Sequence, residues 1–96
     1  MLTVLQTETF AAWFAGLPDR RARARIQMRI DRAEDGNLGS HKSVGGGVSE
    51  MRIDHGPGYR IYYTMRGTQM IVLIAGGDKS TQANDIKAAR ELARQL

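Results

Sequence analysis

Hydrophobic residues recur at helical spacing near the start of the chain. Thr7 can cap a helix whose apolar positions lie three or four residues apart: Phe10, Trp13, Phe14 and Leu17. Pro18 suits the first turn of a second helix that runs to about Asp35, and one face of that helix holds Ala22, Ile26, Ile30 and Ala33. The short apolar run Thr3–Leu5 precedes both. We therefore expect a strand followed by an antiparallel helical hairpin.

After this hairpin the period of the pattern changes to two. Gly36 can end the second helix, and a loop is expected to follow it. From Gly45 onward, apolar and polar residues alternate, and residues 59–65 repeat the alternation. Residues 70–75 are apolar at both parities, which is typical of an interior strand covered on both faces. Turn-forming residues separate the three segments, so we expect an antiparallel meander.

A last helix completes the pattern. Ser80 or Thr81 can cap it, and its apolar residues recur at helical spacing to the end of the chain: Ile86, Ala89, Ala93 and Leu96. With 96 residues and no linker or repeat, we expect residues 1–96 to form one domain.

Composition limits the classes of function. The 14 Lys and Arg residues against 10 Asp and Glu give a net charge of +4 and a pI near 10.0, which favours a polyanion or an acidic protein as a partner. The absence of cysteine excludes disulfides and thiolate chemistry and fits a reducing compartment. No secretion signal or long apolar run is present, so we expect a cytoplasmic protein that does not span the membrane.

The hydrophobic register places two arginines face to face. If Ile53 lies opposite Tyr59, then Arg52 lies opposite Arg60 on the other face, because a slip of one residue would invert every side chain. Two like charges about 4 Å apart repel by about 1 kcal/mol even in water, which stability alone does not favour. An anion between the arginines would reverse the sign, and the guanidinium fork suits phosphate.

A third cation is expected beside this pair. The tight turn after the second strand would fold the next strand back, so that Lys79 ends near Arg60. Three ring side chains would lie close by: Tyr59, Tyr62 and His55. One interpretation is a phosphate-binding cluster of Arg52, Arg60 and Lys79. The alternative is a set of solvated surface charges that Glu50 and Asp54 neutralise.

Other motifs carry less weight. Residues 78–81 lack the glycine spacing of a nucleotide-binding loop, and two histidines without a clustered third ligand predict no metal site. We expect no cofactor. On the second helix, a stripe of arginines beside Met28 predicts a solvated or partner-facing surface: Arg21, Arg25, Arg29 and Arg32.

Three segments together resemble a known family: Gly47–Ile53, Gly56–Tyr63 and Gly76–Gln82. Over nearly its whole length the chain resembles the RelE/ParE toxin superfamily, and within it the HigB-like branch often labelled addiction module killer protein. The resemblance implies an α+β fold, in which an N-terminal strand and a helical hairpin pack on a twisted, mainly antiparallel sheet, with a C-terminal helix. It also implies the toxin of a bacterial toxin–antitoxin pair, whose partner is a small helix-turn-helix antitoxin.

The resemblance further implies an activity and its residues. Relatives in this branch cleave messenger RNA in the ribosomal A site, where the ribose 2′-oxygen attacks the adjacent phosphate. By its motif, Arg60 matches the arginine that binds the scissile phosphate. Arg52 matches a second basic position, and Lys79 matches one that neutralises the transition state or protonates the leaving group. The expected RNA contacts are Lys42, Tyr59 and Tyr62.

The general base is where this sequence departs from the family. RelE-like enzymes often carry a Tyr or His near the C-terminal helix, and residues 82–96 contain neither. Tyr59, Tyr62 or His55 would have to replace it, or positioning of the RNA would suffice without strong proton transfer. We take His55 as the base, because the ordinary pKa of histidine lies nearest neutrality.

Two other functions stay open. ParE relatives share the fold and poison DNA gyrase without cutting RNA, so a non-catalytic gyrase inhibitor is the second hypothesis. A remnant that only binds its antitoxin is the third. In each case we expect the antitoxin to dock on part of the arginine stripe: Arg21, Arg25, Met28 and Arg29.

Overall fold

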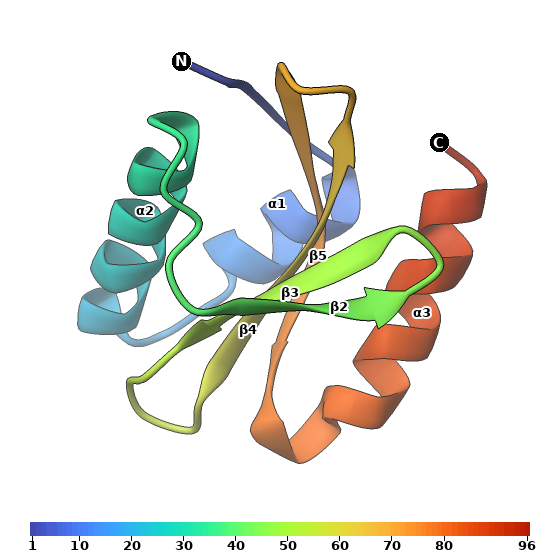
Figure 1. Cartoon of the computed structure of the whole chain (residues 1–96). Coiled ribbons are helices and arrows are strands. Elements are labelled where there is room, and N and C mark those ends of the chain that lie inside the picture. Colours follow the sequence, from blue (N-terminus) through green and yellow to red (C-terminus); the bar gives the residue numbers. More distant parts are fainter.

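The computed structural model describes residues 1–96 as one five-stranded sheet with three α-helices (Figure 1). The elements in chain order are β1 (Thr3–Gln6), α1 (Glu8–Ala15), α2 (Arg20–Glu34), β2 (His41–Gly45), β3 (Val48–Ile53), β4 (Tyr59–Arg66), β5 (Met70–Asp78), the 3-10 turn η1 (Lys79–Thr81) and α3 (Gln82–Arg94). The strand order is β1-β5-β4-β3-β2, with β1 parallel to β5 and the other pairs antiparallel. The predicted α+β fold with a mainly antiparallel sheet is confirmed.

Helices cover both faces of the sheet. α1 and α2 pack on one face, over a cluster of 12 buried residues that includes Phe10 and Ile61. α3 packs on the other face, over a cluster of 5 that includes Tyr62 and Ile74. Figure 1 shows α2 and α3 on opposite sides of the twisted sheet. Residues 71–75 of β5 are buried, as the unbroken apolar run predicted.

The predicted pairing of β3 with β4 is confirmed. Ile53 lies opposite Tyr59, and Arg52 lies opposite Arg60. β4 and β5 are antiparallel as expected, and Arg60 lies opposite Gly77, although a bulge shifts the register farther along the pair. Both arginines therefore share one face of the sheet, the face that α3 covers.

One strand differs from the sequence prediction. The expectation of a loop after α2 is wrong for His41–Gly45, which form β2 at the edge of the sheet and pair with β3. The first three of these residues are polar and exposed. An edge strand of this kind lacks the alternation of apolar and polar residues that marks a half-buried strand.

Side-chain caps determine where the first two helices begin. Thr7 accepts a hydrogen bond from the backbone N–H of Phe10, so the predicted cap of α1 is confirmed. The prediction of Pro18 in the first turn of α2 is wrong. α2 begins at Arg20, because Asp19 Oδ1 accepts hydrogen bonds from the backbone N–H groups of Arg21 and Ala22 in the first turn.

None of the helices has both the length and the apolar character needed to cross a membrane.

The segment after β5 also begins differently than expected. Asp78 caps the short turn η1, since its Oδ1 accepts a hydrogen bond from the backbone N–H of Ser80 at 2.8 Å. Thr81 precedes α3 but makes no capping hydrogen bond. Thr81 is therefore the N-cap residue of α3, as predicted, but without the expected hydrogen bond, and β5 extends to Asp78 before the chain turns into α3.

Two glycines let helices approach β5 from opposite faces. A Cβ on Gly76 would overlap the indole ring of Trp13 in α1, and a Cβ on Gly77 would overlap the carboxylate of Asp85 in α3. Neighbouring strand residues point to opposite faces, so this pair admits one helix on each side. Because Gly77 lies opposite Arg60, the close approach of α3 brings the start of that helix beside the arginine pair.

Candidate phosphate-binding cleft

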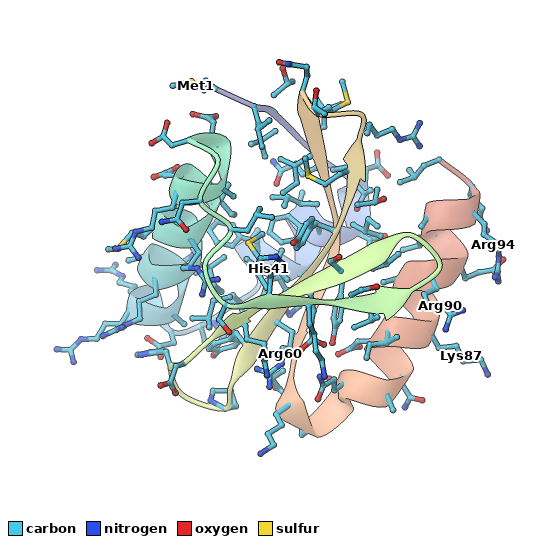
Figure 2. The ribbon with its side chains drawn as sticks, in the orientation of Figure 1. Met1, His41, Arg60, Lys87, Arg90 and Arg94 are labelled. Carbon is cyan, nitrogen blue, oxygen red and sulfur yellow. The ribbon has the colours of Figure 1, made fainter.

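A cleft lies where the turn between β3 and β4 meets the end of β5. Its volume is about 390 Å³, and its lining residues are Ser40, Arg52, Ile53, Asp54, Gly58, Arg60 and Lys79. The backbone N–H of Lys79 donates to the carbonyl oxygen of Pro57 at 3.4 Å, which joins η1 to that turn. Figure 2 shows Arg60 at the lower end of the sheet. The three cations that register predicted to meet, Arg52, Arg60 and Lys79, line this one cleft.

Arg60 is held in place by the backbone of the turn. Its side chain is 12% exposed, and its Nη1 donates to the carbonyl oxygens of Gly58 at 2.9 Å and Tyr59 at 3.2 Å. Gly58 has a φ of +79°, and a Cβ there would lie 3.4 Å from Arg60 Nη1 and 3.5 Å from Lys79 Cβ. Arg60 and Lys79 thus both pack against the Gly58 backbone.

A buried carboxylate contacts both arginines. Glu50 is fully buried, and its Oε2 lies 3.5 Å from Arg60 Nε and 3.9 Å from Arg52 Nε. Its Oε1 accepts a hydrogen bond from Gln82 Nε2, at the start of α3, at 2.9 Å. The alternating pattern places Glu50 on a polar face, but that face is covered, because α3 packs over it.

The interpretation of these residues as solvated, neutralised charges holds only in part. Glu50 does neutralise charge on the arginines, but its carboxylate lies in the protein interior and not at the surface. The arginine side chains are 44% exposed at Arg52 and 12% exposed at Arg60, so only the first is well solvated. Among the residues that line the cleft, three cations face one carboxylate, Asp54, and Glu50 lies buried beneath the two arginines. Such a cleft favours an anion, and guanidinium groups suit phosphate.

Comparisons with known proteins agree with this fold. The family model described as "Phage derived protein Gp49-like (DUF891)" matches residues 12–96. The chain belongs to the Gp49-like family. An uncharacterized protein of Haemophilus influenzae is 45% identical to the Gp49-like chain over 95 residues, which cover 99% of this chain and 96% of that protein.

The Gp49-like chain is also similar to a solved toxin. A chain of the crystal structure of the intact E. coli RelBE toxin–antitoxin complex matches it with a TM-score of 0.69 and 14% identity, covering 81% of this chain and 96% of that one. The fold is therefore that of the RelE toxin.

Two residues predicted for the site of the Gp49-like chain lie on the other face of the sheet. His55 Nε2 lies 3.3 Å from Asp19 Oδ2, at the start of α2, and His55 does not line the cleft. Tyr59 is 8% exposed and packs edge-on against Trp13, with ring centroids 6.2 Å apart. The structure corrects both predictions: Tyr59 belongs to the core, and His55 points away from the arginine pair.

Tyr62 lies on the expected face but is covered. It is fully buried under α3, and its hydroxyl has no hydrogen-bond partner. Burial, and after it the negative charge of Glu50, raise the pKa of Tyr62 far above its ordinary value. Tyr62 therefore stays protonated and cannot contact a ligand at the surface, so its predicted role as an RNA contact or base is wrong.

Lys42 is placed on the same face as the arginine pair. It lies directly opposite Glu50 in the β2–β3 ladder, and it is exposed. It does not line the cleft, so an RNA strand would have to extend beyond the cleft toward β2 to reach it.

The arginine stripe borders a second cavity, on the α2 side. Its volume is about 390 Å³, and it is lined by Arg25, Met28, Arg29, Arg32, Ile53 and Asp54. Arg29 is committed to the fold, because its guanidinium donates to the carbonyl oxygens of Leu38, Ser40 and Arg52. Arg21 does not line this cavity.

Sequence reasoning missed part of the cleft. Ser40 lines it, and Gln82 supports Glu50 from α3. Asp54 was expected only to neutralise the cations, and it is itself a lining residue of the cleft. Gln82 carried no signal, since its contact depends on how α3 packs. No three His, Asp or Glu side chains come together as a metal site would require.

Proposed function

We propose that this chain is the toxin of a bacterial toxin–antitoxin pair, of the HigB-like kind, and that it cleaves messenger RNA in the ribosomal A site. The observation that carries the proposal is the convergence of Arg52, Arg60 and Lys79 on one cleft. Family membership and the RelE fold support the toxin role. A toxin that acts on ribosomes works in the cytoplasm.

The cleft can supply the electrostatic part of RNA cleavage. The ribose 2′-oxygen attacks the adjacent phosphorus and the bond to the 5′-oxygen breaks, giving a 2′,3′-cyclic phosphate and a 5′-hydroxyl. Arg60 and Arg52 bind the non-bridging oxygens, on which negative charge builds in the transition state. Lys79, exposed at the rim, neutralises or protonates the departing 5′-oxygen.

Asp54 is the group in this cleft that can accept the proton of the 2′-hydroxyl. It is an exposed carboxylate that lines the cleft. Glu50, in contrast, is buried and paired with both arginines, and His55 contacts Asp19 on the other face of the sheet. We expect Asp54→Asn to lower the cleavage rate more than tenfold, because general base catalysis contributes about 10²–10⁴-fold. His55→Gln is the comparison variant, and it should cleave within twofold of wild type.

The partner we propose is a small helix-turn-helix antitoxin encoded beside this chain. The RelBE structure is a toxin–antitoxin complex. On this chain, the cavity on the α2 side has basic walls and apolar surface from Met28, which is 51% exposed. An acidic segment of the antitoxin with an apolar anchor would fit it. Because Arg29 holds the fold, the test is charge reversal at Arg25 and Arg32, which should weaken antitoxin binding without lowering toxicity.

The decisive experiment compares two charge-matched variants in growing cells. Arg60→Ala should abolish growth arrest, whereas Arg66→Ala, at the opposite end of β4, removes the same charge and should arrest growth like wild type. Co-purification of each variant with its antitoxin checks that it folds. Full toxicity of Arg60→Ala would overturn the assignment of this cleft.

Mapping of RNA 5′ ends in the same cells tests the reaction itself. Wild type should create new 5′ ends within codons, and Arg60→Ala should not. New supercoiling defects without new RNA ends would instead identify a gyrase inhibitor. The absence of any growth arrest would identify a remnant that only binds its antitoxin.

A further inference from the structure

Glu50 is the one acidic side chain that the fold buries completely. It lies on β3 between two neighbours in the sheet, Lys42 on β2 and Tyr62 on β4, and α3 covers it. Removing a carboxylate from water is strongly unfavourable unless other groups compensate for the lost hydration. The groups around Glu50 therefore indicate what its charge is used for.

Each oxygen of Glu50 has a separate role. Oε1 accepts a hydrogen bond from Gln82 Nε2 at 2.9 Å, which holds the carboxylate from the α3 side. Oε2 forms ion pairs without a hydrogen bond, at 3.5 Å from Arg60 Nε and 3.9 Å from Arg52 Nε. One oxygen thus contacts both arginines, and in both cases the nearest nitrogen is Nε.

Contact at Nε leaves the outer edges of the guanidinium groups free. Arg60 uses Nη1 for the carbonyl oxygens of Gly58 and Tyr59, and its Nη2 makes no hydrogen bond within the chain. Neither terminal nitrogen of Arg52 makes one either. Both arginines line the cleft, and these free nitrogens are the groups with which they can bind an anion there. Without Glu50, two adjacent cations would repel and separate.

We propose that Glu50 is a positioning residue that, held by Gln82, orients Arg52 and Arg60 so that both bind one phosphate group of the RNA. The inference rests on the proposed function, because the phosphate is the scissile one. Glu50 does not touch the RNA itself; it acts through the two arginines. Its negative charge weakens the general attraction for a polyanion and in return fixes the geometry of the phosphate site.

This role predicts a split between binding and cleavage. Glu50→Gln keeps the shape of the side chain and an oxygen for Gln82, but it removes the negative charge. RNA binding should be unchanged or tighter, since the cleft becomes more positive. The cleavage rate at saturating RNA should fall at least tenfold, since the arginines are no longer held together. A rate equal to or above that of wild type would show that Glu50 only neutralises charge and would overturn the proposal.

Gln82→Leu is the second variant, in case Glu50→Gln unfolds. It keeps the charge of Glu50 and frees Oε1, and it should lower the cleavage rate about threefold to tenfold with RNA binding unchanged. Asn84→Ala, exposed in the same turn of α3, is the matched control and should cleave like wild type. Equal rates for Gln82→Leu and Asn84→Ala would contradict the positioning role of Glu50.

Phosphate binding separates failure of this inference from failure of the proposed function. Titration of 15N-labelled protein with inorganic phosphate is followed at the Nε–H resonances of Arg52 and Arg60. In wild type both should shift along one saturation curve, and in Glu50→Gln they should shift independently. Independent curves in wild type would overturn the inference even if the chain cuts RNA. A shared curve without RNA cleavage would support it while the proposed reaction fails.

Discussion

The face of the sheet under α1 and α2 buries a cluster of 12 residues, whereas the face under α3 buries a cluster of 5 and a carboxylate. The first cluster contains paired aromatic rings, such as Phe10 with Trp13 at 5.7 Å between centroids. The second adjoins the unpaired hydroxyl of Tyr62 and the Glu50 ion cluster. Apolar burial stabilises by about 25 cal/mol per Å², while a buried ion is unfavourable by several kcal/mol before compensation.

The difference teaches that stability and chemistry are divided between the two faces. The α1/α2 face supplies most of the apolar burial. The α3 face has the smaller apolar cluster, and it holds Arg52 and Arg60 beside a buried carboxylate at the cleft. Substitutions on the first face should therefore change stability, and substitutions around Glu50 should change function.

The largest effect is expected from a matched pair of core isoleucines. Ile61 and Ile74 are both fully buried, one in each cluster. Truncation to alanine lowers stability by about 2–5 kcal/mol, depending on how well the surroundings collapse. We expect Ile61→Ala near the upper end of that range and Ile74→Ala near the lower end, because α3 can settle onto the smaller cluster. Urea unfolding measures both, and the reverse order would contradict the division of the two faces.

The next effect comes from the two glycines of β5. Gly76→Ala would push on Trp13, and Gly77→Ala would push on Asp85 at the start of α3. Overpacking of this kind lowers stability by about 1–3 kcal/mol, and we expect that loss in both variants. The folded fraction of Gly77→Ala should also lose RNA cleavage more than tenfold, since the start of α3 shifts away from Arg60. The folded fraction of Gly76→Ala should cleave normally, and equal activity in the two variants would count against this coupling.

A smaller effect is expected from Tyr62→Phe. The hydroxyl has no partner, so its removal should leave stability at pH 7 within about 1 kcal/mol of wild type, or increase it. Burial raises the pKa of Tyr62 above 10.0 in the folded state, so the unfolded chain releases this proton first as the pH rises. Wild type should lose stability above pH 10, and the variant should lose less. Chemical denaturation at pH 8 and pH 10.5 tests this, and parallel losses would contradict it.

The smallest effect is expected at the pair between His55 and Asp19. The pKa of Asp19 is lowered, first by the backbone N–H of Ala22 and then by His55. The stability that this carboxylate contributes is present above its ordinary pKa of 3.8 and is lost as the pH falls through the lower, folded value. In His55→Ala, the loss of stability at acidic pH should be slightly smaller than in wild type. The rate of RNA cleavage should not change. Circular dichroism at pH 3 and pH 6 measures the difference, and an unchanged acid profile would show that the pair contributes nothing.

Much of the fold could be predicted from local patterns, because the alternation of apolar and polar residues and the choice of turn residues depend only on sequence neighbours. These patterns predicted the register of β3 and β4, and with it the position of Arg52 opposite Arg60. The missed strand β2 is a polar edge strand, which needs only one partner and carries no apolar pattern. The start of α2 shifted because Asp19 caps it, and the turn η1, which Asp78 caps, was not predicted.

The site was less predictable than the fold, because it depends on which surfaces become covered. The pattern of β3 and β4 places Glu50 and Tyr62 on a polar face, but it does not say that α3 will cover that face. Once α3 packs there, an expected surface tyrosine becomes core and an expected surface glutamate becomes the buried partner of two arginines. The orientation of His55 likewise depends on Asp19, a residue 36 positions away.

Cleavage of messenger RNA on purified ribosomes tests the proposed reaction most directly. Ribosomes programmed with a defined messenger and an empty A site are mixed with excess toxin, and the rate of a single round of cleavage is measured. Wild type should cut within the A-site codon and leave a 2′,3′-cyclic phosphate, with Arg60→Ala at least a hundredfold slower and Arg66→Ala unchanged. An intact messenger with wild type, or equal rates for wild type and Arg60→Ala, would contradict a phosphate site built from Arg52, Arg60 and Lys79.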